Sequence, residues 1–290
     1  RVAAAKIPDG ATVFSSGIAG NARCSIFFYA LRDRFLKSGH PKDLFWINGG
    51  AQGSRGRVPG TIEELGLPGL MKTYLTAHLE TAKAQLKLGS EGLLELHTLP
   101  QGIIAQLLAG QGSGQHHLHS RVGWHSFLDP ATGRGSLVNP PGEYSFVRHE
   151  NDGLRYNMPK VTVALFNVPY ADPEGNLYFK NASTISENLE AVAAARHNGG
   201  IVMAAVSQII AKSKEEISVP AEQVDYIVVN PFNEQTITVP QRRYWELFTP
   251  YFRGSRRKAV RKLKFINDFL KITPVRDEIA QMMGQLAASL

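Results

Sequence analysis

Short apolar segments and longer amphipathic segments alternate along most of this chain. The short segments are rich in β-branched and aromatic residues, which predicts strands over residues 12–16, 43–48, 93–99, 161–168, 201–210 and 224–229. The longer segments predict helices over residues 23–37, 70–88, 103–108 and 185–197. Strands that alternate with helices in this way indicate an α/β protein with a mostly parallel sheet flanked by helices.

Two regions interrupt this alternation. Residues 110–153 are rich in Gly, Pro and His, and we expect them to be mainly loops. Residues 241–290 are expected to form a helical C-terminal extension that follows an α/β domain of residues 1–240. The last predicted helix reaches the end of the sequence without a glycine stop, so we expect the native polypeptide to continue.

Length and composition limit the class of protein. The 290 residues are 43% apolar, which is enough for a buried core, and no apolar run approaches the roughly 20 residues that cross a bilayer. The sequence therefore predicts a protein without a membrane-spanning segment. Cys24 is the single cysteine, which excludes an internal disulfide and fits a reducing, cytoplasmic location. Its apolar neighbours favour a buried small hydrophobe over a nucleophile.

The net charge of +7 comes from one short segment, residues 253–264. Its cations are Arg253, Arg256, Arg257, Lys258, Arg261, Lys262 and Lys264. Without them, the 25 basic residues that remain equal the 25 acidic residues. A nucleic-acid-binding protein usually spreads its basic residues over a binding face, so we expect no nucleic-acid partner. The segment is either a solvated helix face or a docking surface.

The segment from Asp9 to Gly20, DGATVFSSGIAG, combines a turn, a strand and a glycine-containing elbow before a helix. Small residues let a ligand approach the backbone closely. Asn21 is expected to cap the helix over 23–37, which would leave N–H groups directed at the elbow. Such donors suit an oxyanion or a phosphate, so the elbow suggests acyl or phosphoryl chemistry.

Several segments, in order, resemble class I CoA-transferases of the acetate/propionate and 3-oxoacid type. They are DGATVFSSGIAG at 9–20, GHPKDL at 39–44, the glycine loop after 48, PGLMK at 68–72, LPQG at 99–102, FLDP at 127–130 with Gly133 and Gly135, YAD at 170–172 with Gly175 and Asn176, and VDYIVV at 224–229. The resemblance runs from residue 1 to roughly 250.

The resemblance implies a chain that is the first, or alpha, half of an enzyme with two related α/β halves. In this family a glutamate of the second half attacks the acyl-CoA and carries CoA as a glutamyl thioester. No catalytic nucleophile is therefore expected in this chain. The resemblance assigns an oxyanion and CoA-thioester loop to Gly17, Ile18, Ala19, Gly20 and Asn21, and a substrate cleft to Pro100, Gln101 and Gly102.

The implied partners follow from the same resemblance. They are a second CoA-transferase half, in the same native chain or as a separate subunit, together with an acyl-CoA and a carboxylic acid. No permanently bound cofactor or metal is expected, because the CoA thioester is a substrate. A homo-oligomer or hetero-oligomer is implied. The basic segment 253–264 could also contact a CoA phosphate.

Ser186-Glu187-Asn188 resembles the Ser-Glu-Asn-Gly context of the family nucleophile, but Leu189 replaces the glycine. We interpret Glu187 as a capping residue at the start of the helix over 185–197, because a helical surface offers no tight turn for a thioester.

The remaining motifs have weaker spacing. Residues 115–119 (QHHLH) and His125 match no zinc pattern, so we interpret them as a polar loop over the active-site cleft. Gly50, Gly53 and Gly56 lack dinucleotide-binding spacing. Arg55 and Arg57 either contact a CoA phosphate or lie in solvent.

Three alternatives to the transferase remain open. One is a CoA-thioester hydrolase or ring-opening relative without the glutamate. Another is a sugar-phosphate isomerase or sugar sensor of the related fold, which would need carboxylates clustered near the elbow. The third is a non-catalytic interaction protein that uses the basic helix.

Overall fold

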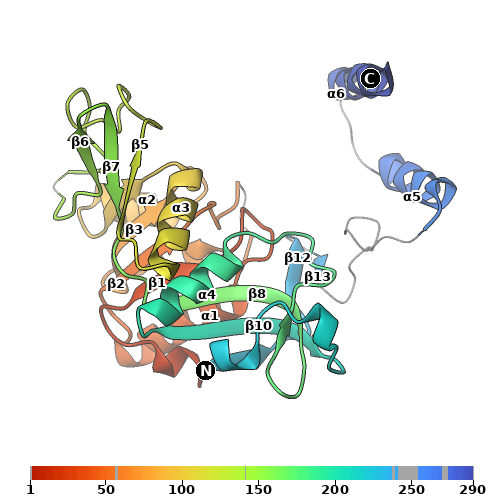
Figure 1. The fold of residues 1–290 in the computed structure, drawn as a ribbon, viewed down its shortest axis with the longest axis horizontal. Coiled ribbons are helices and arrows are strands. Elements are labelled where there is room, and N and C mark those ends of the chain that lie inside the picture. The colour runs from red at the N-terminus through yellow and green to blue at the C-terminus, as the bar shows by residue number, and fades with distance from the viewer. Residues whose placement is uncertain are drawn as a thin grey trace. The chain divides into compact units, whose positions relative to one another are not determined.

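A seven-stranded parallel sheet with one short antiparallel strand forms the centre of the computed structural model (Figure 1). The strand order is β11-β10-β8-β1-β2-β3-β4, with β9 paired antiparallel to β8. The strands are β1 Thr12–Ser15, β2 Leu44–Asn48, β3 Met71–Thr76, β4 Glu95–Thr98, β8 Val163–Ala171, β9 Leu177–Tyr178, β10 Ile201–Ile209 and β11 Tyr226–Val229. The structure describes residues 2–55, 58–140, 142–236, 239–240, 254–269 and 274–289.

Helices cover both faces of this sheet because successive strand residues point to opposite sides. On one face α3 (Gln101–Gly112) and α4 (Asn188–His197) lie side by side, and residues such as Phe14 and Phe166 pack there (Figure 1). On the other face α1 (Ser25–Ser38) and α2 (Lys83–Ser90) pack over residues such as Val13 and Leu165. The expected α/β class with a mostly parallel sheet is confirmed.

Short 3-10 helices precede or connect these elements in the described part of the chain. They are η1 Ala4–Lys6, η2 Ile62–Leu65, η3 Lys214–Glu216 and η4 Ala221–Gln223. Cys24 is fully buried before α1, and burial raises the pKa of its thiol, so its assignment as a buried hydrophobe is confirmed.

The helix expected over 70–88 is wrong. Its first part is strand β3, which pairs in parallel with β2 and β4, and only Lys83–Ser90 is helical. Leu70, Met71, Tyr74 and Leu75 have helical spacing, but all four are buried because β3 lies inside the sheet. Tertiary pairing therefore overrides the local periodicity.

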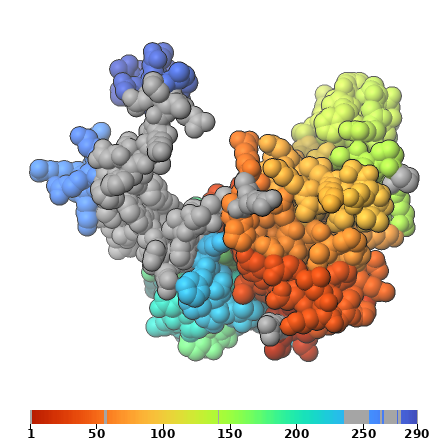
Figure 2. Space-filling view, turned by 180° about the vertical axis from the view of Figure 1, so that it is seen from behind, coloured from red at the N-terminus to blue at the C-terminus, as the bar shows by residue number. Residues whose placement is uncertain are grey.

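The expectation of a mainly loop region over 110–153 is also partly wrong. Strands β5 (His117–Ser120), β6 (Val147–Glu150) and β7 (Gly153–Asn157) form an antiparallel sheet in the order β5-β7-β6. We call residues 117–157 the three-stranded lobe; in Figure 2 its yellow-green surface projects from the main body. Val147, Leu154 and Tyr156 anchor it in the core.

The chain divides into two compact units, residues 1–244 and 245–290. The first also contains the antiparallel pair β12 (Glu234–Thr236) and β13 (Val239–Pro240). In the second, α5 (Arg256–Phe269) and α6 (Pro274–Ser289) confirm a helical C-terminal end. The domain boundary at 240 stays a prediction, and Arg253 lies outside the described residues. No helix among the described residues is long and apolar enough to span a membrane.

Candidate functional site

The elbow follows β1 at the carboxyl end of the strand and forms a tight turn. Ile18 and Asn21 exchange two backbone hydrogen bonds, of 3.1 and 2.8 Å between N and O. Gly17 has a φ of 123°, and a Cβ there would lie 3.0 Å from the carbonyl oxygens of Asn21 and Ala22. Only glycine fits this position without strain.

Most of the elbow's backbone donors already have partners. Gly17 N–H donates to Ser186 Oγ, Ala19 N–H to the Ala51 carbonyl, and Ile18 and Asn21 to each other. Of the five elbow residues, only Gly20 has an N–H without a partner among the described residues. The oxyanion role predicted for residues 17–21 therefore stays a prediction, and it depends mainly on Gly20.

The expectation that Asn21 caps α1 is wrong. The helix begins at Ser25 with Cys24 as the N-cap residue, and no side chain makes a capping hydrogen bond. The Asn21 backbone is instead committed to the turn with Ile18.

Gln52 of the glycine loop is hydrogen-bonded to the residues that lead into the elbow. Its fully buried side chain accepts a hydrogen bond from Ser15 Oγ at 2.7 Å. Its Nε2 donates to the carbonyl oxygens of Ser15 at 3.1 Å and Ser16 at 2.6 Å. Trp46 Nε1 donates to Ser15 Oγ at 2.9 Å. Because buried polar groups are costly to leave unpaired, this network holds the elbow and the glycine loop in one arrangement.

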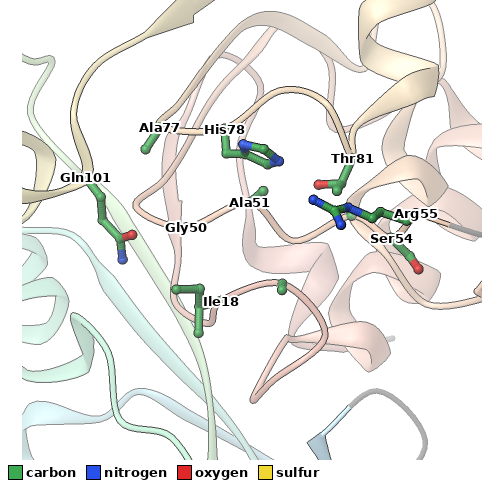
Figure 3. A pocket seen from close by; sticks show the side chains of 11 residues that line it. Ile18, Gly50, Ala51, Ser54, Arg55, Ala77, His78, Thr81 and Gln101 are labelled. Atoms are coloured by element: carbon green, nitrogen blue, oxygen red, sulfur yellow. The ribbon is translucent and has the colours of Figure 1, made fainter. Parts of the chain in front are cut away.

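A cavity of about 480 Å³ opens beside the elbow, at the carboxyl ends of β1, β2 and β3 (Figure 3). Its lining residues are Ile18, Ala19, Gly50, Ala51, Gly53, Ser54, Arg55, Ala77, His78, Thr81 and Gln101. Gly53 is packed so closely that a Cβ would lie 1.8 Å from the Thr81 carbonyl oxygen. The carboxyl edge of a parallel sheet is where α/β proteins commonly bind ligands.

Two basic side chains lie at the mouth of this cavity. Arg55 lies 3.7 Å from Glu80 Oε2 with a side chain that is 82% exposed, and His78 Nε2 lies 3.3 Å from the same oxygen. The Arg55 side chain lies in solvent, which is one of the two positions expected from the sequence, and it also lines the cavity. Its contact with a CoA phosphate stays a prediction. Arg57 lies outside the described residues.

The predicted cleft residues meet the elbow only in part. Gln101 lines the cavity with Ile18 and Ala19 (Figure 3). Pro100 is the N-cap residue of α3, and a Cβ added to Gly102 in the first turn would have no heavy atom within 4 Å. The structure brings Gln101 together with the elbow, while Pro100 and Gly102 do not line the cavity.

Glu187 is the N-cap residue of α4, so its expected position at the start of the helix is confirmed. The helix begins at Asn188 rather than at residue 185, however, and the Glu187 side chain makes no capping hydrogen bond. The residue is only 6% exposed, and its Oε1 accepts from Gln101 Nε2 at 3.2 Å. The Ser-Glu-Asn motif was the sequence signal for this position. Its interpretation as a helix cap gave no indication of the contact with Gln101.

The histidine-rich segment lies apart from the cavity. His117 and His119 are exposed on β5, and His125 stacks on Trp124 with ring centroids 4.3 Å apart. None of them lines the cavity, so the interpretation as a loop over the cleft is not supported. Among the described residues no group of three or more His, Cys, Asp or Glu side chains could hold a metal ion.

Pairwise comparison finds relatives that are CoA-transferases. The chain is 31% identical over 264 residues to a caffeate CoA-transferase of Acetobacterium woodii, covering 89% of this chain and 49% of the relative. It is 27% identical over 236 residues to the acetate CoA-transferase YdiF of Escherichia coli K12, covering 79% and 44%. No family profile matches the chain.

Comparison of structures also leads to YdiF. The fold matches a thioester complex of the acyl-CoA transferase YdiF of E. coli O157:H7 with a TM-score of 0.75 and 25% identity. That match covers 81% of this chain and 47% of the YdiF chain, so the chain spans about half the length of the relatives it matches. These similarities and the fold support membership of the class I CoA-transferase family.

Proposed function

We propose that this chain is the first half of a CoA-transferase that moves CoA between an acyl-CoA and a carboxylic acid. The observation that carries the proposal is the cavity beside the elbow, the loop to which the sequence resemblance assigns the CoA thioester. The half-length match to the relatives supports a second half that supplies the rest of the site.

The proposed mechanism is covalent ping-pong transfer with the nucleophile on the second half. A glutamate carboxylate attacks the thioester carbonyl, the C–S bond breaks, and an acyl-glutamyl anhydride and CoA thiolate form. The thiolate then attacks the glutamyl carbonyl, which releases the donor carboxylate and leaves a glutamyl-CoA thioester. The acceptor carboxylate then attacks the glutamyl-CoA thioester, which forms a second anhydride and releases CoA thiolate. The thiolate attacks the acceptor's acyl carbonyl, so the new acyl-CoA leaves and the glutamate is regenerated.

Each attack places negative charge on a carbonyl oxygen. The Gly20 N–H, which has no partner among the described residues, is the elbow donor available to such an oxyanion. One donor of this kind contributes about 3–4 kcal/mol to transition-state stabilisation. The cavity walls formed by Ile18, Ala19 and Ala51 would exclude water from the thioester.

Activity of the isolated chain tests this proposal. We expect no CoA transfer from acetyl-CoA to a panel of carboxylates, and no change with Glu187→Ala. We expect the complete native protein to transfer CoA and to form a hydroxylamine-sensitive CoA adduct that peptide mapping places outside residues 1–290. Turnover by the isolated chain that survives Glu187→Ala would refute the two-half arrangement. Turnover lost in Glu187→Ala would make Glu187 the nucleophile, and CoA release without transfer would indicate a hydrolase.

The basic helix α5 is proposed to contact the second half or a CoA phosphate. Arg256, Arg257 and Arg261 are exposed on it. Reversing these three residues to Glu should weaken assembly or raise the KM for acyl-CoA, and the difference from the native protein should shrink in high salt. Unchanged assembly and KM, with binding to a random DNA duplex lost, would assign α5 to nucleic acid instead.

A further inference from the structure

Ser186 and Glu187, which directly precede α4, connect three distant segments of the candidate site. Ser186 Oγ accepts the Gly17 N–H at 3.0 Å, and Glu187 Oε1 accepts from Gln101 Nε2 at 3.2 Å. The Glu187 carboxylate also packs on Gly49, where a Cβ would lie 2.4 Å from Oε1. The elbow, the glycine loop and the start of α3 are thus held by two adjacent residues.

The contact with Glu187 determines which end of the Gln101 amide faces the cavity. A carboxamide has a donor end and an acceptor end, whereas a carboxylate oxygen accepts. Nε2 is therefore turned toward Glu187, and Figure 3 shows the carboxamide oxygen on the side of the other lining residues. No described residue donates to this oxygen, so it is offered to a ligand.

Glu187 itself is not placed to react. Its Oε2 is buried without a hydrogen-bond partner among the described residues, and the residue is not part of the cavity lining. Gln101 lines the cavity, so a thioester bound there would contact Gln101 rather than Glu187. Glu187 can therefore influence a ligand only through the side chain that it orients.

We propose that Glu187 is a positioning residue that makes Gln101 a hydrogen-bond acceptor, and that this acceptor selects a donor on the bound thioester. Much of the surrounding wall is apolar, including Ile18, Ala51 and Ala77, so one oriented polar group has a large share in specificity. The inference rests on the proposed function, because acyl-CoA carries such donors in two places. These are the amide N–H groups of the pantetheine arm and a hydroxyl of a hydroxylated acyl group.

Binding calorimetry on the complete native protein tests this inference. The probes are S-acetylpantetheine and its analogues in which each amide N–H in turn is replaced by an ester oxygen. We expect the native protein to bind the amide about fivefold more tightly than one of the esters, as for one neutral hydrogen bond. In Glu187→Gln the preference should fall to about twofold or less, because the new carboxamide can pair with either end of the Gln101 amide. Glu190→Gln in the first turn of α4 is the matched control and should keep the native preference.

An exchange of the two side chains separates orientation from folding. In the double variant Glu187→Gln with Gln101→Glu, the amide at position 187 donates to the carboxylate at position 101, whose second oxygen faces the cavity. The preference for the amide probe should return to the native value, even where the added charge weakens binding of every probe. If Glu187 contributed only to stability, this exchange would not restore the preference for the amide probe.

The outcomes are distinguishable. If the native protein binds no pantetheine or CoA thioester at all, the proposed function fails. If it binds them and discriminates 3-hydroxybutanoyl-CoA from butanoyl-CoA instead of amide from ester, the donor lies on the acyl group, and Glu187→Gln should abolish that discrimination. If both preferences are absent, or are unchanged in Glu187→Gln, the positioning role of Glu187 is refuted.

Discussion

The polar side chains at the carboxyl edge of the parallel sheet are held differently from the exposed polar side chains of the three-stranded lobe. At the sheet edge, Ser15, Gln52 and Glu187 are buried and bonded to segments far away in the sequence. In the lobe, Arg121 and Asp152 are exposed and paired with each other. Buried polar groups lose water and must keep their partners, while exposed groups exchange partners with solvent at little cost. Substitutions should therefore couple stability to ligand binding at the edge and not at the exposed positions of the lobe.

The largest expected effect comes from Gly53→Ala. The new Cβ would meet the Thr81 carbonyl oxygen at 1.8 Å, so the cavity wall must move. We expect a loss of about 3 kcal/mol in the free energy of unfolding, measured by urea denaturation, together with weaker CoA binding. Gly102→Ala is the matched control, since nothing lies within 4 Å of its added Cβ. Equal stability of the two variants would show that the glycine loop can accommodate a Cβ at position 53 at little cost in free energy.

A smaller loss is expected for Ser15→Ala. Removing the hydroxyl leaves Trp46 Nε1 and Gln52 Oε1 buried without this partner. We expect a decrease of about 2 kcal/mol in the free energy of unfolding. Ser120→Ala in the lobe, whose hydroxyl accepts from the exposed Val122 N–H, should change it by less than about 0.5 kcal/mol. Similar losses in both variants would remove the distinction between the two regions.

The sequence predicts features that depend on local patterns better than features that depend on distant contacts. Strands β1, β2 and β8 were predictable because each is a short apolar run bounded by turn residues, and the elbow was predictable because Gly17 and its neighbours allow a close turn. Strand β3 was not, since its apolar spacing also fits a helix and only pairing with β2 and β4 decides it. The place of Glu187 beside Gln101 depends on a contact between residues 86 positions apart, which local patterns do not encode.

Acid sensitivity should distinguish one buried histidine. His97 lies within 2.6 Å of Glu95 Oε1 and 2.9 Å of Ser136 Oγ, and burial lowers its pKa despite the opposing effect of the carboxylate. The unfolded chain then binds a proton at a higher pH than the folded protein does, so stability is full above the ordinary histidine pKa and falls as the pH drops below it. Between pH ~7.5 and pH ~5, the free energy of unfolding should fall more steeply in the native protein than in His97→Gln. Equal slopes would contradict this assignment.

The smallest effect is expected for Arg121→Ala in the lobe. Arg121 lies 2.7 Å from Asp152 Oδ2 and 5.4 Å from the centre of the Trp124 ring, but both charged side chains are more than 60% exposed. The hydrogen bond and charge of Arg121 hold the pKa of Asp152 below its usual value, so the variant should raise that pKa in an NMR titration. Any stability from the pair is present above the unfolded aspartate pKa and is lost as the pH falls through the folded value. The melting temperature near neutral pH should change by about 1 °C, and by less in roughly 0.5 M salt, because exposed pairs are screened. A loss of stability as large as that expected for Ser15→Ala would mean that this exposed pair of side chains, too, is a fixed polar contact.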